Sequence, residues 1–475
     1  MSFQRFDTSC YIGGQPVDSR QRLDVHYPYD DEVVGSIPLL DLEQSQAAIH
    51  SCLDYDHHLT RYDRSQILSQ VRTLLLERVD EFANLIRLET GLCQRETNYE
   101  VGRAVDVLQF ASMEALRDDG EIFSCDVSKT GKQRKIFTTR EPLSVVLAIT
   151  PFNHPLNQVA HKVAPAIAAG APVILKPSEK TPLTAIRFTE LLYEAGLPGN
   201  MLQVVLGDVG AVVEPLIADP RIDLVSFTGS AAIGKRIASQ AGYKRLCLEL
   251  GGNSPLIVLD DADLDLAERL ACEGCYRNSG QRCTAVKRLL VHRDILEEFT
   301  DRVVARTAEY VCGDPADPDT RVGTVIDEAA ARRLKQVVDA AVQQGGRVLV
   351  GGNQQGARME PTVIANVPRD ATMVVEESFG PLAPILAVDD LDDAIDLANS
   401  TAYGLSSGIV TKDLERALTA ARRIRTGTVN INDVPGYRIE CSPFGGIKDS
   451  GLGVKEGVIE AVKTMTYVKT FSLPW

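Results

Sequence analysis

The stretch VVLAITPFNHPLNQVAHKVAPAIAAGAPVILKP, residues 145–177, indicates the fold class of this chain. It contains two short apolar runs, VVLAIT and PVILKP, separated by an apolar stretch of helical length. Short apolar strands that alternate with helices are typical of a parallel sheet, because parallel strands need a crossover that is usually a helix. The pattern continues with LQVVLG, LVSFTG and RLCLELGG, so we expect a doubly wound, Rossmann-like α/β domain.

The segments on either side complete the expected organisation. Helical patterns cover residues 65–82 and about 98–117, upstream of the strands. A second α/β block is expected downstream, with strands such as KRLLVHR and RVLVGG. Two leftover β-rich segments attach to neither core and are expected to form a small bridging arm that pairs with another subunit. The expected division is 1–118 with 141–248 for the first α/β unit, 249–434 for the second α/β unit, and 119–140 with 435–475 for the arm.

Composition and charge narrow the function classes. The 475 residues are 44% apolar and 24% charged, which is ordinary for soluble globular proteins. A formal net charge of −15 leaves no general basic field for phosphate backbones, so no nucleic-acid partner is expected. The longest apolar run, residues 163–175, is too short to span a bilayer, and MSFQRFDTSCYIGG lacks the apolar core of a signal peptide. We therefore expect no membrane partner and a cytoplasmic location.

Ten cysteines are scattered along the chain, and we expect them to be reduced thiols. Cys272 and Cys275 form a C-x-x-C that could suggest zinc, but no second pair lies at the right distance, so no metal is expected. Cys283 differs from the others because it follows Arg282 in the basic stretch NSGQRCTAVKR, residues 278–288. Positive charge and an open approach favour the reactive thiolate. Cys283 is therefore the candidate nucleophile, and a packing thiol is the alternative.

A phosphate-binding turn is predicted where the strand LVSF runs into TGSAAIGKRIA. Gly229 and Gly234 lie at the start of a helix, where backbone N–H groups attract a pyrophosphate. The spacing is not G-x-G-x-x-G, so a plain glycine-bearing turn is the alternative. Lys176 and Glu179 follow another strand, at the edge where open α/β sheets bind ligands. A carboxylate at Glu179 can accept both ribose hydroxyls and would repel a 2′-phosphate, which favours NAD; Lys180 beside it keeps NADP open.

Five motifs, FTGS, LELGGNSP, GQRC, EESFGP and PFGGIKDSG, occur in the order and spacing of the aldehyde dehydrogenase superfamily, which the whole chain resembles. The resemblance implies cofactor-binding, catalytic and bridging domains in a homodimer or homotetramer. It also implies that Cys283 attacks the aldehyde, that Asn153 donates to the oxyanion, and that Glu249 activates water to hydrolyse the thioester. The cofactor-binding positions that it implies are Thr150, Lys176, Ser178, Glu179, Phe227, Gly229, Ser230, Gly234, Leu250, Glu377 and Phe379.

Three cationic residues bear on the substrate. Arg282 departs from the smaller or apolar residue that most members of the superfamily have before the nucleophile. His154 follows the oxyanion asparagine, and Arg103 lies on the second predicted helix, so three donors could converge on one anion. Three donors suit a tetrahedral headgroup better than a planar carboxylate. At these points the chain is similar to the phosphonoacetaldehyde dehydrogenase branch, which implies oxidation of phosphonoacetaldehyde to phosphonoacetate in 2-aminoethylphosphonate breakdown.

Other interpretations stay open at this point. Arg282 could pair with an acid, Arg103 could be a solvated helix residue, and His154 could cap a turn. Arg438, in GYRIE, could also face the pocket, and the sequence does not rank it against Arg103. The substrate could instead be lactaldehyde, succinate semialdehyde or sulfoacetaldehyde. A coenzyme A-acylating enzyme and a scaffold without turnover fit less well, because the hydrolytic base and the other catalytic candidates are intact.

Overall fold

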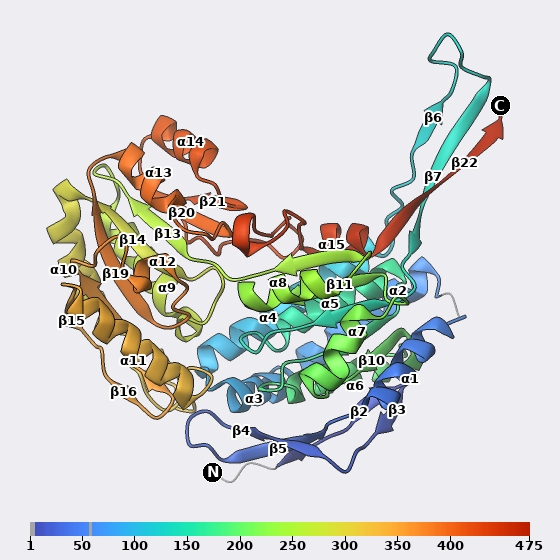
Figure 1. Ribbon diagram of the computed structural model, residues 1–475, viewed down its shortest axis with the longest axis horizontal. Coiled ribbons are helices and arrows are strands. Elements are labelled where there is room, and N and C mark those ends of the chain that lie inside the picture. The colour runs from blue at the N-terminus through green and yellow to red at the C-terminus, as the bar shows by residue number, and fades with distance from the viewer. Residues whose placement is uncertain (1–4, 57–58) are drawn as a thin grey trace.

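Two seven-stranded sheets form the two halves of the computed structural model, which describes residues 5–56 and 59–475 (Figure 1). The first sheet lies in the blue-to-green half of Figure 1, and the second lies in the yellow-to-red half. A three-stranded antiparallel sheet projects from the body as an arm. The predicted fold class, a Rossmann-like doubly wound unit with a second α/β unit and a small β arm, is confirmed.

The first sheet has the strand order β12-β11-β8-β9-β10-β2-β3. The five strands from β12 to β10 are parallel, and each corresponds to one of the predicted apolar runs. Their bounds are Val146–Ile149 for β8, Val173–Lys176 for β9, Leu202–Val204 for β10, Leu224–Thr228 for β11 and Arg245–Glu249 for β12. The strands β2 (Cys10–Ile12) and β3 (Gln15–Val17) close one edge as an antiparallel hairpin.

The chain reverses its direction across this sheet between β8 and β11. Strands β8, β9 and β10 run outward in one direction, and the chain then returns to place β11 on the other side of β8. Ligands of open α/β sheets bind outside the carboxyl ends of strands at such a switch point. The register places Ile149 beside both Lys176 and Phe227, so the loops that follow β8, β9 and β11 open at the same edge.

Helices cover the first sheet. They are α1 (Leu42–Leu53), α2 (Arg61–Glu77), α3 (Val79–Thr90), α4 (Gln94–Glu114), α5 (Asn157–Ala169), α6 (Leu183–Glu194), α7 (Glu214–Ala218), α8 (Ala231–Gln240) and α15 (Val458–Thr464). The helical pattern over residues 65–82 is two helices rather than one, because the backbone of Arg78 leaves the helical region at the junction. Every residue of α5 is buried, as expected for a helix enclosed between the sheet and other helices.

The second sheet has the order β15-β18-β19-β14-β13-β20-β21, with only β15 antiparallel to its neighbour. Its strands are β13 (Ser254–Val258), β14 (Val286–His292), β15 (Arg347–Val350), β18 (Thr362–Ala365), β19 (Leu382–Val388), β20 (Ser406–Val410) and β21 (Thr428–Ile431). Its main helices are α9 (Leu264–Tyr276), α10 (Leu296–Thr307), α11 (Glu328–Gln343), α13 (Leu391–Asn399) and α14 (Leu414–Arg423). The chain passes from β12 to β13 through residues 250–253, so the two sheets adjoin there.

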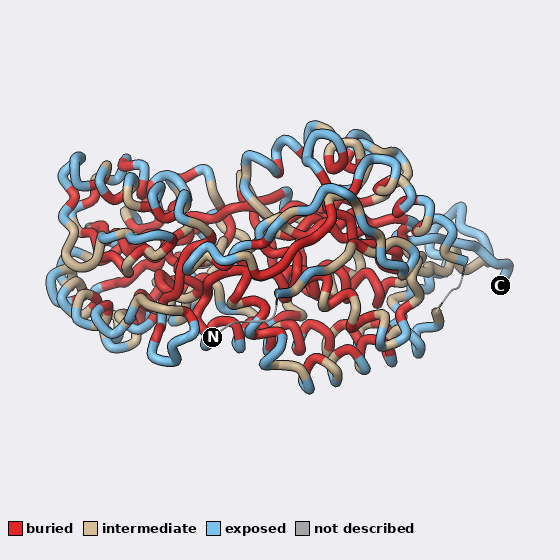
Figure 2. The backbone as a smooth tube through the Cα atoms, turned by 90° about the horizontal axis from the view of Figure 1, so that it is seen from below, coloured by how far each residue is buried: buried red, intermediate tan, exposed pale blue. Residues whose placement is uncertain are grey.

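The arm consists of β6 (Ile122–Ser124), β7 (Arg134–Pro142) and β22 (Thr466–Pro474). Strand β22 pairs with β7 along its whole length, so two segments far apart in the sequence lie side by side. Figure 2 shows the arm as largely exposed, in contrast to the buried backbone that runs through the body. Within the part of the chain that the structure describes, no helix is both long enough and apolar enough to cross a membrane.

Two buried carboxylates hold the helices that follow β8 and β9. Glu100, on α4, accepts hydrogen bonds from Leu156 N at 2.8 Å and Asn157 N at 3.0 Å, at the start of α5. Glu89, on α3, accepts from the backbone N–H groups and hydroxyl at the start of α6. The first N–H groups of a helix have no partner within the helix and attract negative charge. These two side chains therefore fix the helices behind the loops of the switch point.

We expect Glu89→Ala to lower the free energy of unfolding by about 2–4 kcal/mol, because each buried donor left without an acceptor costs about 1–3 kcal/mol. Calorimetry would measure the melting temperature, with Glu77→Ala, an exposed position on α2, as the matched control. Equal melting temperatures for the two variants would show that the buried carboxylate contributes nothing to stability.

Candidate active site

Cys283 and Glu249 come from different parts of the fold and meet at the junction of the two sheets. Glu249 is the last residue of β12, and Cys283 lies in the loop that leads into β14. Cys283 Sγ lies 3.5 Å from Glu249 Oε1. Glu249 Oε2 has no hydrogen-bond partner among the described residues, so this oxygen remains free to accept one. The geometry thus places a thiol beside a carboxylate that can hold its proton.

Burial raises the pKa of both groups. The pKa of the Cys283 thiol lies above its usual value because of burial first and the Glu249 carboxylate second, and Arg438 is the positive charge that opposes this rise most. The pKa of Glu249 is raised to about 8 by burial and then by the neighbouring Glu456 carboxylate. Both groups therefore keep their protons to higher pH than isolated groups would. The sequence predicts that Arg282 favours ionisation of the thiol, but the positive charges that lower the thiol pKa most are Arg438 and then Lys287.

A buried ion pair lies behind Glu249. Lys162, a fully buried residue of α5, donates to Glu456 Oε1 at 2.7 Å and to Ser226 Oγ at 2.9 Å. Burial is the largest influence on Glu456 and opposes its ionisation, but Lys162, Glu249 and His161 together outweigh burial and lower the pKa of Glu456 to about 2. After burial, the charge of Glu456 is the main reason that its neighbour Glu249 keeps a proton more easily than an isolated carboxyl would.

Amide side chains join the loop after β8 to the loop that carries Cys283. Asn153 Nδ2 donates to the Gln281 carbonyl at 2.8 Å. In the opposite direction, Asn278 Nδ2 donates to the Asn153 carbonyl at 3.1 Å and to the Gln281 carbonyl at 3.3 Å. One proton of the Asn153 amide is directed at the nucleophile loop in this way, and the second remains for another acceptor.

The turn before the nucleophile has a left-handed backbone. The φ angle is 57° at Asn278, 52° at Ser279 and 71° at Gly280. Residues other than glycine rarely adopt this left-handed region of backbone angles, and the residues that do are concentrated at functional sites. The hydrogen bonds of Asn278 compensate for part of this cost and keep the turn in one conformation.

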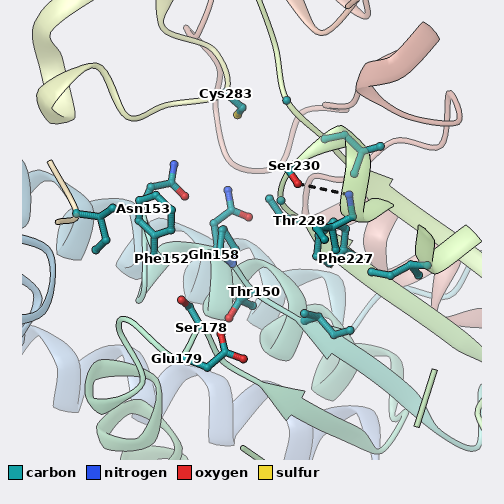
Figure 3. A pocket seen from close by; sticks show the side chains of 18 of the residues that line it. Thr150, Phe152, Asn153, Gln158, Ser178, Glu179, Phe227, Thr228, Ser230 and Cys283 are labelled. Atoms are coloured by element: carbon teal, nitrogen blue, oxygen red, sulfur yellow. Dashed lines mark hydrogen bonds between the residues drawn. The ribbon is translucent and has the colours of Figure 1, made fainter. Parts of the chain in front are cut away.

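A cavity of about 710 Å³ lies at the switch point and ends at Cys283. Figure 3 shows Cys283 on one side of this cavity, far from Ser178 and Glu179, with Asn153 and Gln158 between the loops. All of the predicted cofactor-binding residues except Gly234 line it. These lining residues are Thr150, Lys176, Ser178, Glu179, Phe227, Gly229, Ser230, Leu250, Glu377 and Phe379.

Gly234 does not line the cavity but packs against a residue that does. It is buried on α8, and a Cβ atom at this residue would lie 2.3 Å from Leu250 Cδ2. Glycine therefore lets α8 approach Leu250, which does line the cavity. The start of the helix is capped by Ser230, whose hydroxyl accepts from Ile233 N at 3.4 Å, the contact drawn in Figure 3.

Charged side chains stand at both ends of the cavity. Near one end, Lys176 and Glu179 form an ion pair, and Lys180 instead pairs with Asp327 at 3.0 Å. Near Cys283, Glu377 accepts from Gly252 N at 3.1 Å. Sequence reasoning missed part of the wall, because Asp327, Ala330 and Arg333 come from the beginning of α11 and carry no motif.

Arg103, His154 and Arg282 lie close enough to influence one another. Burial lowers the pKa of His154, Glu100 opposes this effect, and the positive charges of Arg103 and Arg282 reinforce it. The Arg103 guanidinium donates to both oxygens of Glu440, from Nε at 2.5 Å and from Nη2 at 3.2 Å. His154 Nδ1 lies 3.3 Å from Glu100 Oε2. Arg103 is therefore paired rather than solvated, and His154 contacts an acid.

Arg282 has weaker contacts than the other two. Its Nη2 approaches the Glu273 carbonyl at 3.5 Å and the Gly274 carbonyl at 3.3 Å, at the end of α9. Over residues 5–56 and 59–475, no carboxylate forms a salt bridge with it, and its buried Nε has no hydrogen-bond partner. Burial lowers the pKa of Arg282 to about 10, and the nearby Arg277 contributes to the same shift. Arg282 is thus a half-buried cation that still has a donor to offer.

Arg438 is the cation with the largest effect on the pKa values of Cys283 and Glu249. It lowers the pKa of both Cys283 and Glu249, against the larger effect of burial. Its guanidinium lies 3.8 Å above the centre of the Phe444 ring and 3.9 Å from Glu440 Oε2. Glu440 is shared with His161 Nε2 at 2.6 Å. Both Arg438 and Arg103 therefore lie within 4 Å of the Glu440 carboxylate.

Cys272 and Cys275 are fully buried on α9, where Cys272 Sγ lies 3.8 Å from Thr307 Oγ1. Burial raises the pKa of Cys272 to about 12. In the described part of the chain, no group of three or more His, Cys, Asp or Glu side chains is arranged to hold a metal ion.

Known proteins resemble this chain over nearly its whole length. The model of the aldehyde dehydrogenase family matches residues 16–471. A 3-sulfolactaldehyde dehydrogenase from Priestia aryabhattai is 38% identical over 96% of each chain. A sulfoacetaldehyde dehydrogenase from Neptuniibacter caesariensis is 36% identical over 93% of this chain and 97% of that protein. The NADP complex of NADP-dependent glyceraldehyde-3-phosphate dehydrogenase from Bacillus halodurans C-125 superposes with a TM-score of 0.96 at 35% identity, over 99% of each chain. The chain therefore belongs to the aldehyde dehydrogenase family of oxidoreductases.

Proposed function

We propose that this protein oxidises a small anionic aldehyde with NAD through a covalent intermediate on Cys283, and that its preferred substrate is phosphonoacetaldehyde. The observation that carries the substrate class is Arg282. Its buried Nε has no partner among the described residues, although Arg103 and His154 lie close by. A buried guanidinium donor without an acceptor is costly, and an anionic headgroup would satisfy it.

The cavity has the chemistry that a dinucleotide needs. Its lining includes Gln158 and Thr228, and over the described residues Gln158 Oε1 and Thr228 Oγ1 lack hydrogen-bond partners. We assign Glu179 to the ribose hydroxyls at one end and Glu377 to the ribose at the Cys283 end. NAD, when bound there, supplies the hydride acceptor. NADP remains an alternative, and a structural relative is named as a complex with NADP.

The proposed reaction uses three residues. Cys283 Sγ attacks the aldehyde carbon, and its proton passes to Glu249, whose Oε1 lies 3.5 Å away. Asn153 donates to the oxyanion that forms, and loss of such a donor lowers kcat by about a hundred- to a thousandfold. Glu249 then releases this proton to solvent, and after oxidation its ionised carboxylate removes a proton from water, so that the oxygen of this water attacks the thioester, displaces the Cys283 sulfur and releases the acid. The unpartnered Glu249 Oε2 supports this second role.

Positive charge beyond Cys283 supports an anionic headgroup. Arg282 and Arg438 are both half-buried, and neither forms a close salt bridge within the described residues. Arg103 keeps one terminal nitrogen outside its pair with Glu440. Two relatives are named for aldehydes that bear a sulfonate, which shares the tetrahedral three-oxygen geometry of a phosphonate. Sulfoacetaldehyde is therefore the main competing substrate, with lactaldehyde and succinate semialdehyde behind it.

We also propose the boundaries of three functional units along the chain. Residues 1–118 with 141–248 form the cofactor-binding unit, residues 249–434 form the catalytic unit, and residues 119–140 with 435–475 form the bridging unit. A separate sheet in each range supports this division. Exposed apolar side chains on the arm support assembly into a homodimer or homotetramer through it, and they include Ile122, Val468, Phe471 and Trp475.

The decisive measurement is kcat/KM with NAD for phosphonoacetaldehyde, sulfoacetaldehyde, succinate semialdehyde, lactaldehyde and propanal. We expect phosphonoacetaldehyde to exceed each of the others by about a hundredfold or more, equivalent to about 2.7 kcal/mol of transition-state discrimination. A higher kcat/KM for sulfoacetaldehyde would mean that the same site serves a sulfonate substrate. Similar kcat/KM values for all five aldehydes would show that the site does not recognise an anionic headgroup.

We expect Cys283→Ala to abolish NADH formation while the protein stays folded, because no other thiol contacts Glu249 among the described residues. Absorbance of NADH would measure activity, and circular dichroism would measure folding. Cys312→Ala, at another half-buried thiol, is the control and should retain activity. Appreciable turnover by Cys283→Ala would remove the assignment of the nucleophile.

We expect Arg282→Ala to raise KM for phosphonoacetaldehyde about ten- to a hundredfold, because a charge-assisted hydrogen bond contributes about 1.5–3 kcal/mol. Arg282→Lys keeps the charge but not the planar fork, so its KM should be intermediate. Propanal serves as the uncharged reference substrate. If propanal loses as much efficiency as the phosphonate, Arg282 acts on the thiol or its loop rather than on a headgroup.

A further inference from the structure

Lys287 is a buried lysine beside the nucleophile loop. It lies on β14, and its side chain has no exposed surface. Among the residues that the structure describes, its ammonium group has one hydrogen-bond acceptor, the Arg282 carbonyl oxygen, at 2.7 Å. An ammonium group has three protons and is costly to bury, so a single acceptor leaves it poorly solvated. Packing alone gives no reason for a charge at this position.

The contact acts on the peptide group that precedes the nucleophile. The Arg282 carbonyl accepts from Lys287 Nζ and also from Ala285 N at 3.2 Å. A trans peptide is planar, so its N–H points opposite to its carbonyl. Fixing the Arg282 carbonyl therefore also fixes the direction of the Cys283 N–H. A cation on the carbonyl polarises the peptide and makes that N–H a stronger donor.

The ammonium group also faces the part of the cavity next to Cys283. Lys287 Nζ lies 3.9 Å from Glu377 Oε1 and 5.5 Å from the centre of the Phe379 ring. The other ionisable groups that bear on Lys287 are Cys283, Arg282 and Cys275. Burial lowers the pKa of Lys287, and Glu377 opposes this shift. The groups that bear on the thiol itself are Glu249, Arg438, Glu377 and Lys287.

We propose that Lys287 is a positioning residue that orients the Arg282–Cys283 peptide and supplies positive charge to the Cys283 thiol. The proposal rests on the proposed role of Cys283 as nucleophile. It assigns to Lys287 two effects that a residue needed only for packing lacks, namely a larger fraction of thiolate and a fixed donor toward the developing oxyanion. The contact with Glu377 additionally connects the nucleophile loop to the end of the cavity where the cofactor reacts.

The test is the rate of alkylation of Cys283 by iodoacetamide between pH 7 and pH 9, followed by mass spectrometry of the Cys283 peptide. Lys287→Met removes both the charge and the donor, and Lys287→Arg retains both. We expect Lys287→Met to lower the alkylation rate at a given pH by about tenfold, the effect of one pKa unit on the thiolate fraction. We expect kcat to fall by at least as much while KM for NAD stays within about threefold. Lys287→Arg should restore part of both losses.

Neighbouring Arg288 provides a matched control, because it is equally buried but its guanidinium donates to the Asn253, Leu397 and Ala398 carbonyls. Arg288→Lys should lower the melting temperature without changing the alkylation rate. If Lys287→Met does not fold, Lys287→Gln takes its place with the same expected loss. An alkylation profile of the Met or Gln variant equal to that of the original protein would overturn the proposal. Turnover in Cys283→Ala would instead overturn the role of Cys283, so the two failures are distinct.

Discussion

The hydrogen bond from Asn153 Nδ2 to the Gln281 carbonyl is the contact on which the site depends. Asn153 follows a strand of the first sheet, and Gln281 precedes a strand of the second. Each sheet has its own core, but neither half alone contains both Cys283 and Asn153. This hydrogen bond, together with the two that Asn278 donates, fixes the distance between the two halves beside Cys283. The same hydrogen bonds offset part of the conformational cost of the left-handed turn at residues 278–280.

Charge burial is the second constraint. Glu249, Glu440 and Glu456 are all buried, and a buried carboxylate needs a partner or a proton. Glu456 has Lys162, and Glu440 has Arg103 and His161, so both can remain ionised. Burial and the charge of Glu456 raise the pKa of Glu249, and no cation at salt-bridge distance among the described residues offsets them. Of these three acids, two are paired with cations, and Glu249 is the one that can take and release a proton.

The fold could be predicted from the sequence because it depends on local signals: the apolar runs became the five parallel strands of the first sheet. The family motifs supplied Cys283, Glu249 and Asn153 as expected catalytic residues, and the structure places their segments side by side. Side-chain direction could not be predicted. Arg282 precedes Cys283 in the chain, yet one terminal nitrogen of its guanidinium contacts carbonyls at the end of α9, and Arg438 acts on the thiol from a distant segment. The direction of a side chain in a loop depends on tertiary packing, which the order of residues does not specify.

The raised pKa of Cys283 has a consequence for oxidative stress. Peroxides convert thiolates to sulfenic acids far faster than they attack neutral thiols, and further oxidation is irreversible. Because burial and Glu249 keep the proton on Cys283, the ligand-free protein exposes little of the species that hydrogen peroxide would destroy. A ligand that promotes ionisation of the thiol would promote oxidative damage as well as turnover. Oxidative damage at Cys283 and attack by Cys283 on a substrate would therefore both depend on the same ionised thiol.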